Sequence, residues 1–125
     1  MKYLLDVSTL VALAWTSNLH HANATRWAKG KTLAVCPITE LGFLRVVTSP
    51  AHNASMKQAR EVLADWLQAN DPEFIPADQR ALEGDVAPSS GKTTDWYLAN
   101  LAEKHAMKWA TLDAKATPMA PAAKL

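Results

Sequence analysis

Four acidic residues stand at positions from which their carboxylates can act together. Asp6 and Asp113 each end a short, mainly apolar run that is typical of a buried strand. Glu40 and Asp95 lie in the first turns of segments with helical periodicity. In an open parallel sheet, strand ends and the starts of the following helices meet at one crevice. Carboxylates gathered there repel one another unless a cation joins them, and Mg²⁺ above all takes oxygen ligands. The four residues therefore predict a metal site, whose usual purpose is phosphate chemistry.

Each of these residues also has an ordinary structural interpretation. Asp6 and Asp113 can begin turns or cap helices, and an acidic side chain such as Glu40 or Asp95 is favourable near a helix N-terminus. The apolar residues around Asp6 favour a functional role there, because an unpaired charge beside a core is costly. The prediction depends on the whole set lying at one edge of a sheet.

Composition sets the limits of the other possibilities. The chain has 125 residues and 49% of them are hydrophobic, which is enough for one core in a single domain. A formal net charge of +1 excludes a strongly basic nucleic-acid-binding chain. The single cysteine, Cys36, excludes an intrachain disulfide framework and is expected to be a buried thiol. No apolar run reaches the ~18 residues of a membrane span, so we expect a cytoplasmic protein.

Strand and helix patterns alternate along the chain. Strands are predicted at 2–6, 32–36, 74–75 and 109–112, and helices at 9–15, 18–29, 37–49, 56–67 and 95–105, with Ser8, Pro37, Ser55 and Thr93 or Thr94 at helix starts. This alternation predicts an α/β protein, a three-layer α/β/α sandwich with a small central parallel sheet. We expect one domain over residues 1–116, followed by a tail rich in Ala, Pro and Lys over 117–125. Residues 77–93 give no clear pattern.

Two other motifs carry less weight. His20 and His21 resemble a metal-binding pair, but adjacent helical residues point about 100° apart and do not readily share one ion. Residues 90–93 resemble the end of a phosphate-binding loop, but Val86 stands where that motif needs its first glycine. A surface role for the histidines and an ordinary loop at 90–93 are the better interpretations.

The four acidic motifs, taken in order, resemble those of a known family. They are LLDVSTLVAL at 4–13, PITELGFLRV at 37–46, TDWYLANLA at 94–102 and ATLD at 110–113, joined by His21, Ala24 and Trp27. The chain is similar in these motifs to PIN-domain ribonucleases of the bacterial VapC type, the toxin half of a toxin–antitoxin pair. The resemblance covers residues 2–115 and implies a PIN-like fold.

The resemblance also implies a mechanism. Such an enzyme hydrolyses RNA phosphodiester bonds with Mg²⁺ or Mn²⁺, here held by Asp6, Asp95 and Asp113. Glu40 is expected to act directly or through a bound water. Ser8 and Thr94 are expected to orient the ligands, and Arg45, Lys92 and Lys115 are candidate phosphate partners. Toxins of this type form homodimers and bind an antitoxin that blocks the crevice, so both partners are expected here.

Two departures from the family pattern and two alternatives remain. Ser8 stands where Asn is common, and Ala114-Lys115 stands where an Arg often follows the last Asp. A catalytically silent PIN-like binding or scaffold domain is one alternative, although the presence of all four carboxylates argues for an active enzyme. A related phosphatase or DNA-directed nuclease is the other, because the 2′-OH that distinguishes RNA is read by side-chain geometry.

Overall fold

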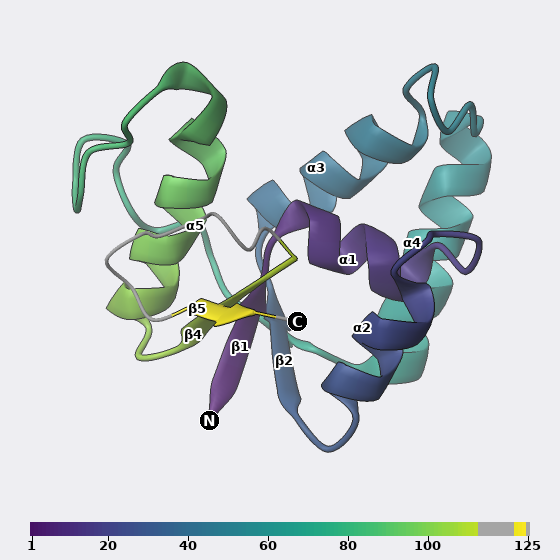
Figure 1. Ribbon diagram of the computed structural model, residues 1–125, viewed down its shortest axis with the longest axis horizontal. Helices are drawn as coiled ribbons and strands as arrows, with labels where there is room; N and C mark the ends of the chain where they lie inside the picture. Colours follow the sequence, from purple (N-terminus) through teal and green to yellow (C-terminus); the bar gives the residue numbers. More distant parts are fainter. Residues whose placement is uncertain (113–121, 125) are drawn as a thin grey trace.

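The centre of the protein is a parallel sheet. The structure, a computed structural model, describes residues 1–112 and 122–124, and its strands run in the order β3-β2-β1-β4-β5 (Figure 1). The strands are β1 (Lys2–Leu5), β2 (Thr32–Val35), β3 (Glu73–Phe74), β4 (Lys108–Thr111) and β5 (Ala122–Lys124). Every neighbouring pair is parallel, and Leu4 at the centre pairs with Ala34 on one side and Trp109 on the other. The predicted parallel sheet is confirmed.

Helices cover both faces of this sheet. They are α1 (Val7–Ala14), α2 (His21–Ala28), α3 (Pro37–Val47), α4 (Met56–Asn70) and α5 (Thr93–Lys104), with a 3₁₀ turn at Ser90–Lys92 before the last. In Figure 1 the first four helices lie on one side of the strands and α5 lies on the other. The predicted three-layer α/β/α sandwich is confirmed.

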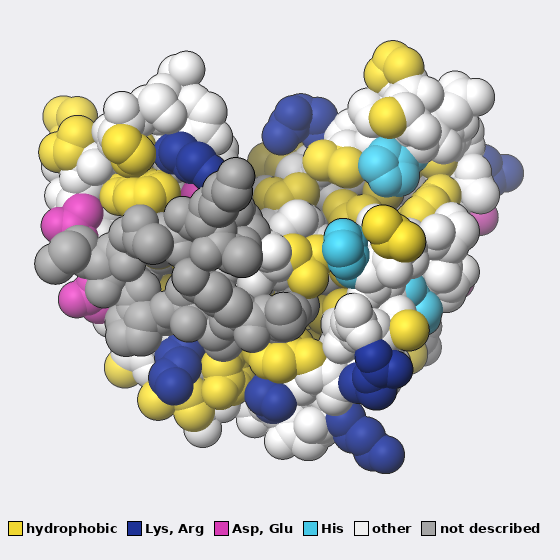
Figure 2. Space-filling model, in the orientation of Figure 1, with side chains coloured by type: hydrophobic (Ala, Val, Ile, Leu, Met, Phe, Trp, Pro, Cys, Tyr) yellow, Lys and Arg dark blue, Asp and Glu magenta, His cyan; other side chains and the backbone are white. Residues whose placement is uncertain are grey.

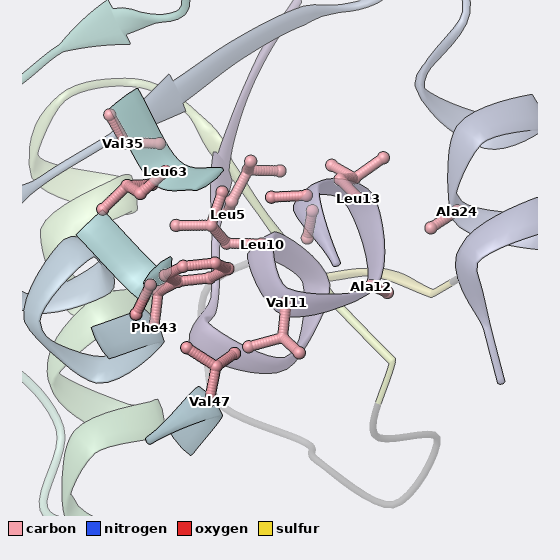
Figure 3. Packing of buried hydrophobic residues seen from close by; sticks show 13 residues of the cluster. Leu5, Leu10, Val11, Ala12, Leu13, Ala24, Val35, Phe43, Val47 and Leu63 are labelled. Atoms are coloured by element: carbon pink, nitrogen blue, oxygen red, sulfur yellow. The ribbon is translucent and has the colours of Figure 1, made fainter. Parts of the chain in front are cut away.

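The alternation of side chains along each strand divides the core into two halves. Leu5 on β1 packs with Leu10 of α1 and Phe43 of α3 in one half (Figure 3). Leu4, its neighbour, points to the opposite face and packs with Trp109 and Leu98 in the half covered by α5. Because both faces are buried, the central strands read as continuous apolar runs.

Two of the predicted helix starts are confirmed and two are wrong. Pro37 occupies the first turn of α3, and the side chain of Ser55 caps α4 by accepting a hydrogen bond from the Gln58 N–H. Ser8 does not cap α1, because Asp6 takes that position. Neither Thr93 nor Thr94 caps α5, because the 3₁₀ turn leads directly into the helix and places Lys92 at its N-cap.

The close crossing of α3 over the start of α1 decides which face of α3 meets the edge of the sheet. A Cβ atom added to Gly42 would lie 2.2 Å from Cγ2 of Val7, so the two helices meet at this glycine. Val46, one turn later, lies on the same face of α3. Glu40 stands two residues before Gly42, about 200° around the helix, and therefore points away from the start of α1.

Part of the segment predicted as a tail belongs to the sheet. Residues 122–124 form β5, which pairs with β4 through Trp109–Ala122 and the two pairs that follow. The predicted domain boundary at residue 116 lies outside the described residues and stays a prediction. None of the helices in the described part of the chain is both long and apolar enough to cross a membrane.

Candidate active site

A pocket of about 410 Å³ lies at the carboxyl ends of β1 and β4. Asp6, which directly follows β1, and Asp95 of α5 both line it. This is the edge at which the sequence places the carboxylates, and two of the four predicted residues meet there. In Figure 2 the surface is hollowed between the α5 side and the α3 side, and a Lys or Arg side chain stands on each side of the hollow.

Asp6 is held in one orientation by the start of α1. Its side chain is 3% exposed. Its Oδ1 accepts a 2.7 Å hydrogen bond from the Thr9 N–H and a 3.0 Å hydrogen bond from the Ser8 hydroxyl. The Asp6 N–H donates to the carbonyl of Ala110 on β4, at 3.1 Å. The carboxylate is therefore fixed by the helix that it caps, and the Asp6 backbone is fixed by the neighbouring strand.

Burial raises the pKa of Asp6 above its ordinary value of 3.8, because the charged form loses hydration. Hydrogen bonds from Thr111, Thr9 and Ser8 act in the opposite direction but do not cancel the effect of burial. A buried carboxylate that is destabilised in its charged form is the expected state of a cation ligand without its cation. The raised pKa of Asp6 thus agrees with its place as a buried carboxylate at the pocket.

The structure describes Asp95 but not Asp113. Asp95 is half-buried in the first turn of α5, where the helix dipole favours a carboxylate. Asp113 lies outside the described residues, so its predicted place in the site stays a prediction. Its chain neighbour Leu112 lines the same pocket.

The structure does not bring Glu40 into this pocket. Glu40 lines a separate groove of about 440 Å³ between α3 and α4, together with Arg60 and the apolar side chains of Leu41 and Leu63. Burial there raises the pKa of Glu40. Across residues 1–112 and 122–124, no three His, Cys, Asp or Glu side chains are grouped closely enough to hold a metal ion. Glu40 lies about 200° around α3 from Gly42, the residue that meets Val7, which agrees with its place in the separate groove.

Of the two residues predicted to orient the ligands, Ser8 contacts a carboxylate of the site and Thr94 is exposed to solvent. Ser8 donates to Asp6, as an orienting hydroxyl would. Thr94 is exposed at the start of α5. Thr9, which was not among the predicted residues, makes more contacts with the site than either. Its N–H donates to Asp6 and its hydroxyl donates to the carbonyl of Ala110, at 3.1 Å. Thr9 stands three residues after Asp6, the position whose N–H an Asp N-cap usually binds, and this spacing could have identified it in the sequence.

Two histidines were also missed as members of the site. His20 and His52 both line the pocket of Asp6 and Asp95. The other two histidines have structural partners elsewhere. A ring nitrogen of His21 lies 2.8 Å from the carbonyl of Ala12. His105 pairs with Asp78 at 2.7 Å, at the end of α5.

The candidate phosphate partners are surface residues. Arg45 is exposed on α3, and Lys92 is half-buried at the N-cap of α5. Lys115 lies outside the described residues.

The chain belongs to the PIN-domain family. The PIN domain family model matches residues 3–120, which is nearly the whole chain. The chain is also similar to curated proteins of one type from Mycobacterium tuberculosis. Ribonuclease VapC38 is 39% identical over 119 residues, covering 89% of this chain and 84% of that protein. Ribonuclease VapC29 is 35% identical over 118 residues, covering 90% and 86%, and Ribonuclease VapC39 is 32% identical over 131 residues, covering 91% and 90%.

A solved structure has the same fold. It is that of VapBC2 from Rickettsia felis bound to a DNA fragment from their promoter, with a TM-score of 0.66 at 15% sequence identity. The match covers 100% of this chain and 99% of the other chain. The predicted VapC-type PIN fold and family are therefore confirmed. The curated relatives named above are all ribonucleases.

Proposed function

We propose that this protein is a divalent-metal-dependent endoribonuclease, the toxin of a toxin–antitoxin pair, that acts at the pocket of Asp6 and Asp95. The observation that carries the proposal is the buried Asp6 carboxylate, which accepts hydrogen bonds from the Ser8 hydroxyl and the Thr9 N–H and lines the same pocket as Asp95. Its relatives at 31–39% identity are ribonucleases, which supports RNA as the substrate.

The donor set fits Mg²⁺ or Mn²⁺. Mg²⁺ is commonly held by one or two carboxylates, with waters and substrate phosphates as its other ligands. Asp6 and Asp95 supply two carboxylates, and Asp113 is proposed as a third because it follows Leu112 at the pocket wall. When bound, such an ion lowers the pKa of a water and offsets charge on the scissile phosphate.

The chain's own residues hold and orient the carboxylates. The Thr9 N–H and the Ser8 hydroxyl both bind Oδ1 of Asp6, so this oxygen keeps a constant direction. Loss of such an outer contact typically costs about 10- to 100-fold in metal affinity or activity. Arg45 and Lys92 are proposed to attract the RNA backbone from the two sides of the pocket.

Glu40 has a lesser part in this proposal than the sequence alone suggests. Its groove is shared with Arg60 and apolar residues of α4, and α3 turns it away from Asp6. We propose that Glu40 acts at most through water. The alternative of a silent scaffold domain is less well supported, because the curated relatives are ribonucleases and the pocket keeps both Asp6 and Asp95.

The proposed partners follow from the relatives and not from a contact in this structure. An antitoxin is proposed because the Rickettsia felis structure is a VapBC complex. A homodimer and a cytoplasmic location are proposed because they are usual for toxins of this type.

The test is cleavage of RNA by the purified chain with Mn²⁺ or Mg²⁺. Transfer RNA, messenger RNA and single-stranded DNA are compared as substrates, and Asp95→Asn and Glu40→Gln are compared as variants. We expect RNA cleavage by the wild type, loss of roughly a hundredfold or more in Asp95→Asn, and a much smaller loss in Glu40→Gln. Cleavage of DNA alone would favour the DNA-directed alternative. No metal-dependent cleavage of either polymer would favour the scaffold.

A further inference from the structure

We propose that His20 and His52 form a nucleobase-binding subsite beside Asp6, which holds one base of the RNA next to the scissile phosphate. This inference rests on the proposed ribonuclease function and adds a substrate-positioning role for two residues. The starting observation is that the two histidines come from different loops, far apart in the sequence, and line the same pocket as Asp6.

Both histidines stand on ordered turns. His20 lies at the N-cap of α2, and its N–H donates to Oδ1 of Asn18, at 2.9 Å. His52 follows α3 in a turn in which its own N–H and that of Asn53 donate to the carbonyl of Ser49, at 3.1 Å and 2.7 Å. Asn53 takes a left-handed backbone conformation, with φ 57°, which closes this turn. The two rings are therefore presented by defined backbone geometry.

One ring nitrogen of His52 is enclosed by the protein, so only the rest of the ring is open to the pocket. This atom, Nδ1, is inaccessible to solvent and makes no hydrogen bond within the described part of the chain. His21 and His105 show the contrast, since each has a protein partner within 2.8 Å.

The remaining walls of the pocket suit a base better than a second phosphate. Val7, Val11 and Val46 provide apolar surface from α1 and α3. A nucleobase is flat, with apolar faces and polar edges, so its faces match these valines and the imidazole rings. A phosphate would lose hydration against the same surface without gaining a fixed cation. Stacking of single-stranded bases on aromatic side chains is a general mode of RNA recognition.

The experiment measures RNA binding in a full-length Asp6→Asn background, in which cleavage is expected to be too slow to disturb the titration. Short single-stranded RNA homopolymers of each base are titrated, and fluorescence anisotropy gives Kd. We expect His52→Ala to weaken binding of the preferred RNA roughly 5- to 100-fold, the range for loss of one base stack. His20→Ala should weaken it in the same direction. His52→Phe should retain most of the affinity, and His105→Ala, the matched control away from the pocket, should bind as the background does.

An abasic scan of the preferred RNA then tests contact with a base. At one position, removal of the base should weaken binding, and His52→Ala should have no further effect on that RNA. Background binding by both His52→Ala and His20→Ala would overturn the subsite while the ribonuclease function stands. A loss that persists on every abasic RNA, or that His52→Phe does not restore, would indicate a phosphate contact or a structural role and would also overturn it. If the wild type neither binds nor cleaves RNA, both proposals fail.

Discussion

Replacing Asp6 with Asn is expected to remove RNA cleavage while making the metal-free protein more stable. The amide keeps an oxygen that can accept the Thr9 N–H, so the cap of α1 is retained. It removes the buried charge, which is the largest cause of the raised pKa of Asp6. We expect cleavage to fall by roughly a hundredfold to a thousandfold. The melting temperature without metal should rise by about 2–6 °C.

The stability advantage of Asp6→Asn over the metal-free wild type should also depend on pH. Asp6 has a folded-state pKa above its ordinary value of 3.8, so its favourable contribution is present below that value. The contribution is lost as pH rises through the folded-state pKa. The difference in free energy of unfolding between wild type and Asp6→Asn should therefore be small in acid and grow toward neutral pH.

Asp65→Asn provides the control for this experiment, because Asp65 is an exposed carboxylate on α4. It should leave both cleavage and melting near the wild-type values. A variant Asp6→Asn that cleaves RNA normally would show that Asp6 is not part of the catalytic site. One that melts lower than wild type at neutral pH would show that the carboxylate is paired favourably in the native state.

Replacing Trp109 with Ala is expected to have the largest effect on folding. Trp109 is fully buried on β4, among Leu4, Leu98 and Leu101 between the sheet and α5. Removing its side chain loses the free energy of burial and leaves a cavity, for a loss of about 3–5 kcal/mol in the free energy of unfolding. Chemical denaturation measures the change. Because domains of this size are stable by only about 5–15 kcal/mol, the variant should be close to unfolding.

Trp109→Phe separates the effect of volume from that of the indole N–H. The Nε1 atom of Trp109 is buried without a hydrogen-bond partner in the described part of the chain, so its removal loses no bond. We expect a much smaller loss of stability than for Ala. Equal losses in the two variants would show that the indole N–H, and not the packed volume, stabilises this half of the core.

The fold could be predicted from local patterns because those patterns agree with the final packing. The apolar runs at β1, β2 and β4 are buried on both faces, and Pro37 and Ser55 begin their helices as expected. Local patterns could not identify the N-cap of α1, which is Asp6 and not Ser8. Asp6 and Ser8 are both good N-cap residues, and the contact of Asp6 with β4 decides between them.

The site could be predicted only in part, because a motif gives the position of a residue in the chain but not the direction of its side chain. Asp6 and Asp95 reach one pocket as predicted. Glu40 lines a separate groove, because the rotation of α3 depends on tertiary contacts such as that of Gly42 with Val7, which no local pattern reveals. His52 reaches the pocket through a turn after α3, and its loop position alone gave no reason to select it.

The pocket of Asp6 and Asp95 is proposed to bind the divalent ion that drives RNA cleavage. The most direct measurement is a Mn²⁺ titration of chelated wild type and Asp95→Asn, in which melting temperature and RNA cleavage are followed on the same samples. Binding to the native state at 100 times Kd adds about 2.7 kcal/mol. We predict that the wild-type melting temperature rises and that cleavage appears over the same range of Mn²⁺, with neither change in Asp95→Asn. An equal rise in melting temperature in both proteins, or wild-type cleavage that persists in chelator, would show that this pocket does not bind the ion that drives cleavage.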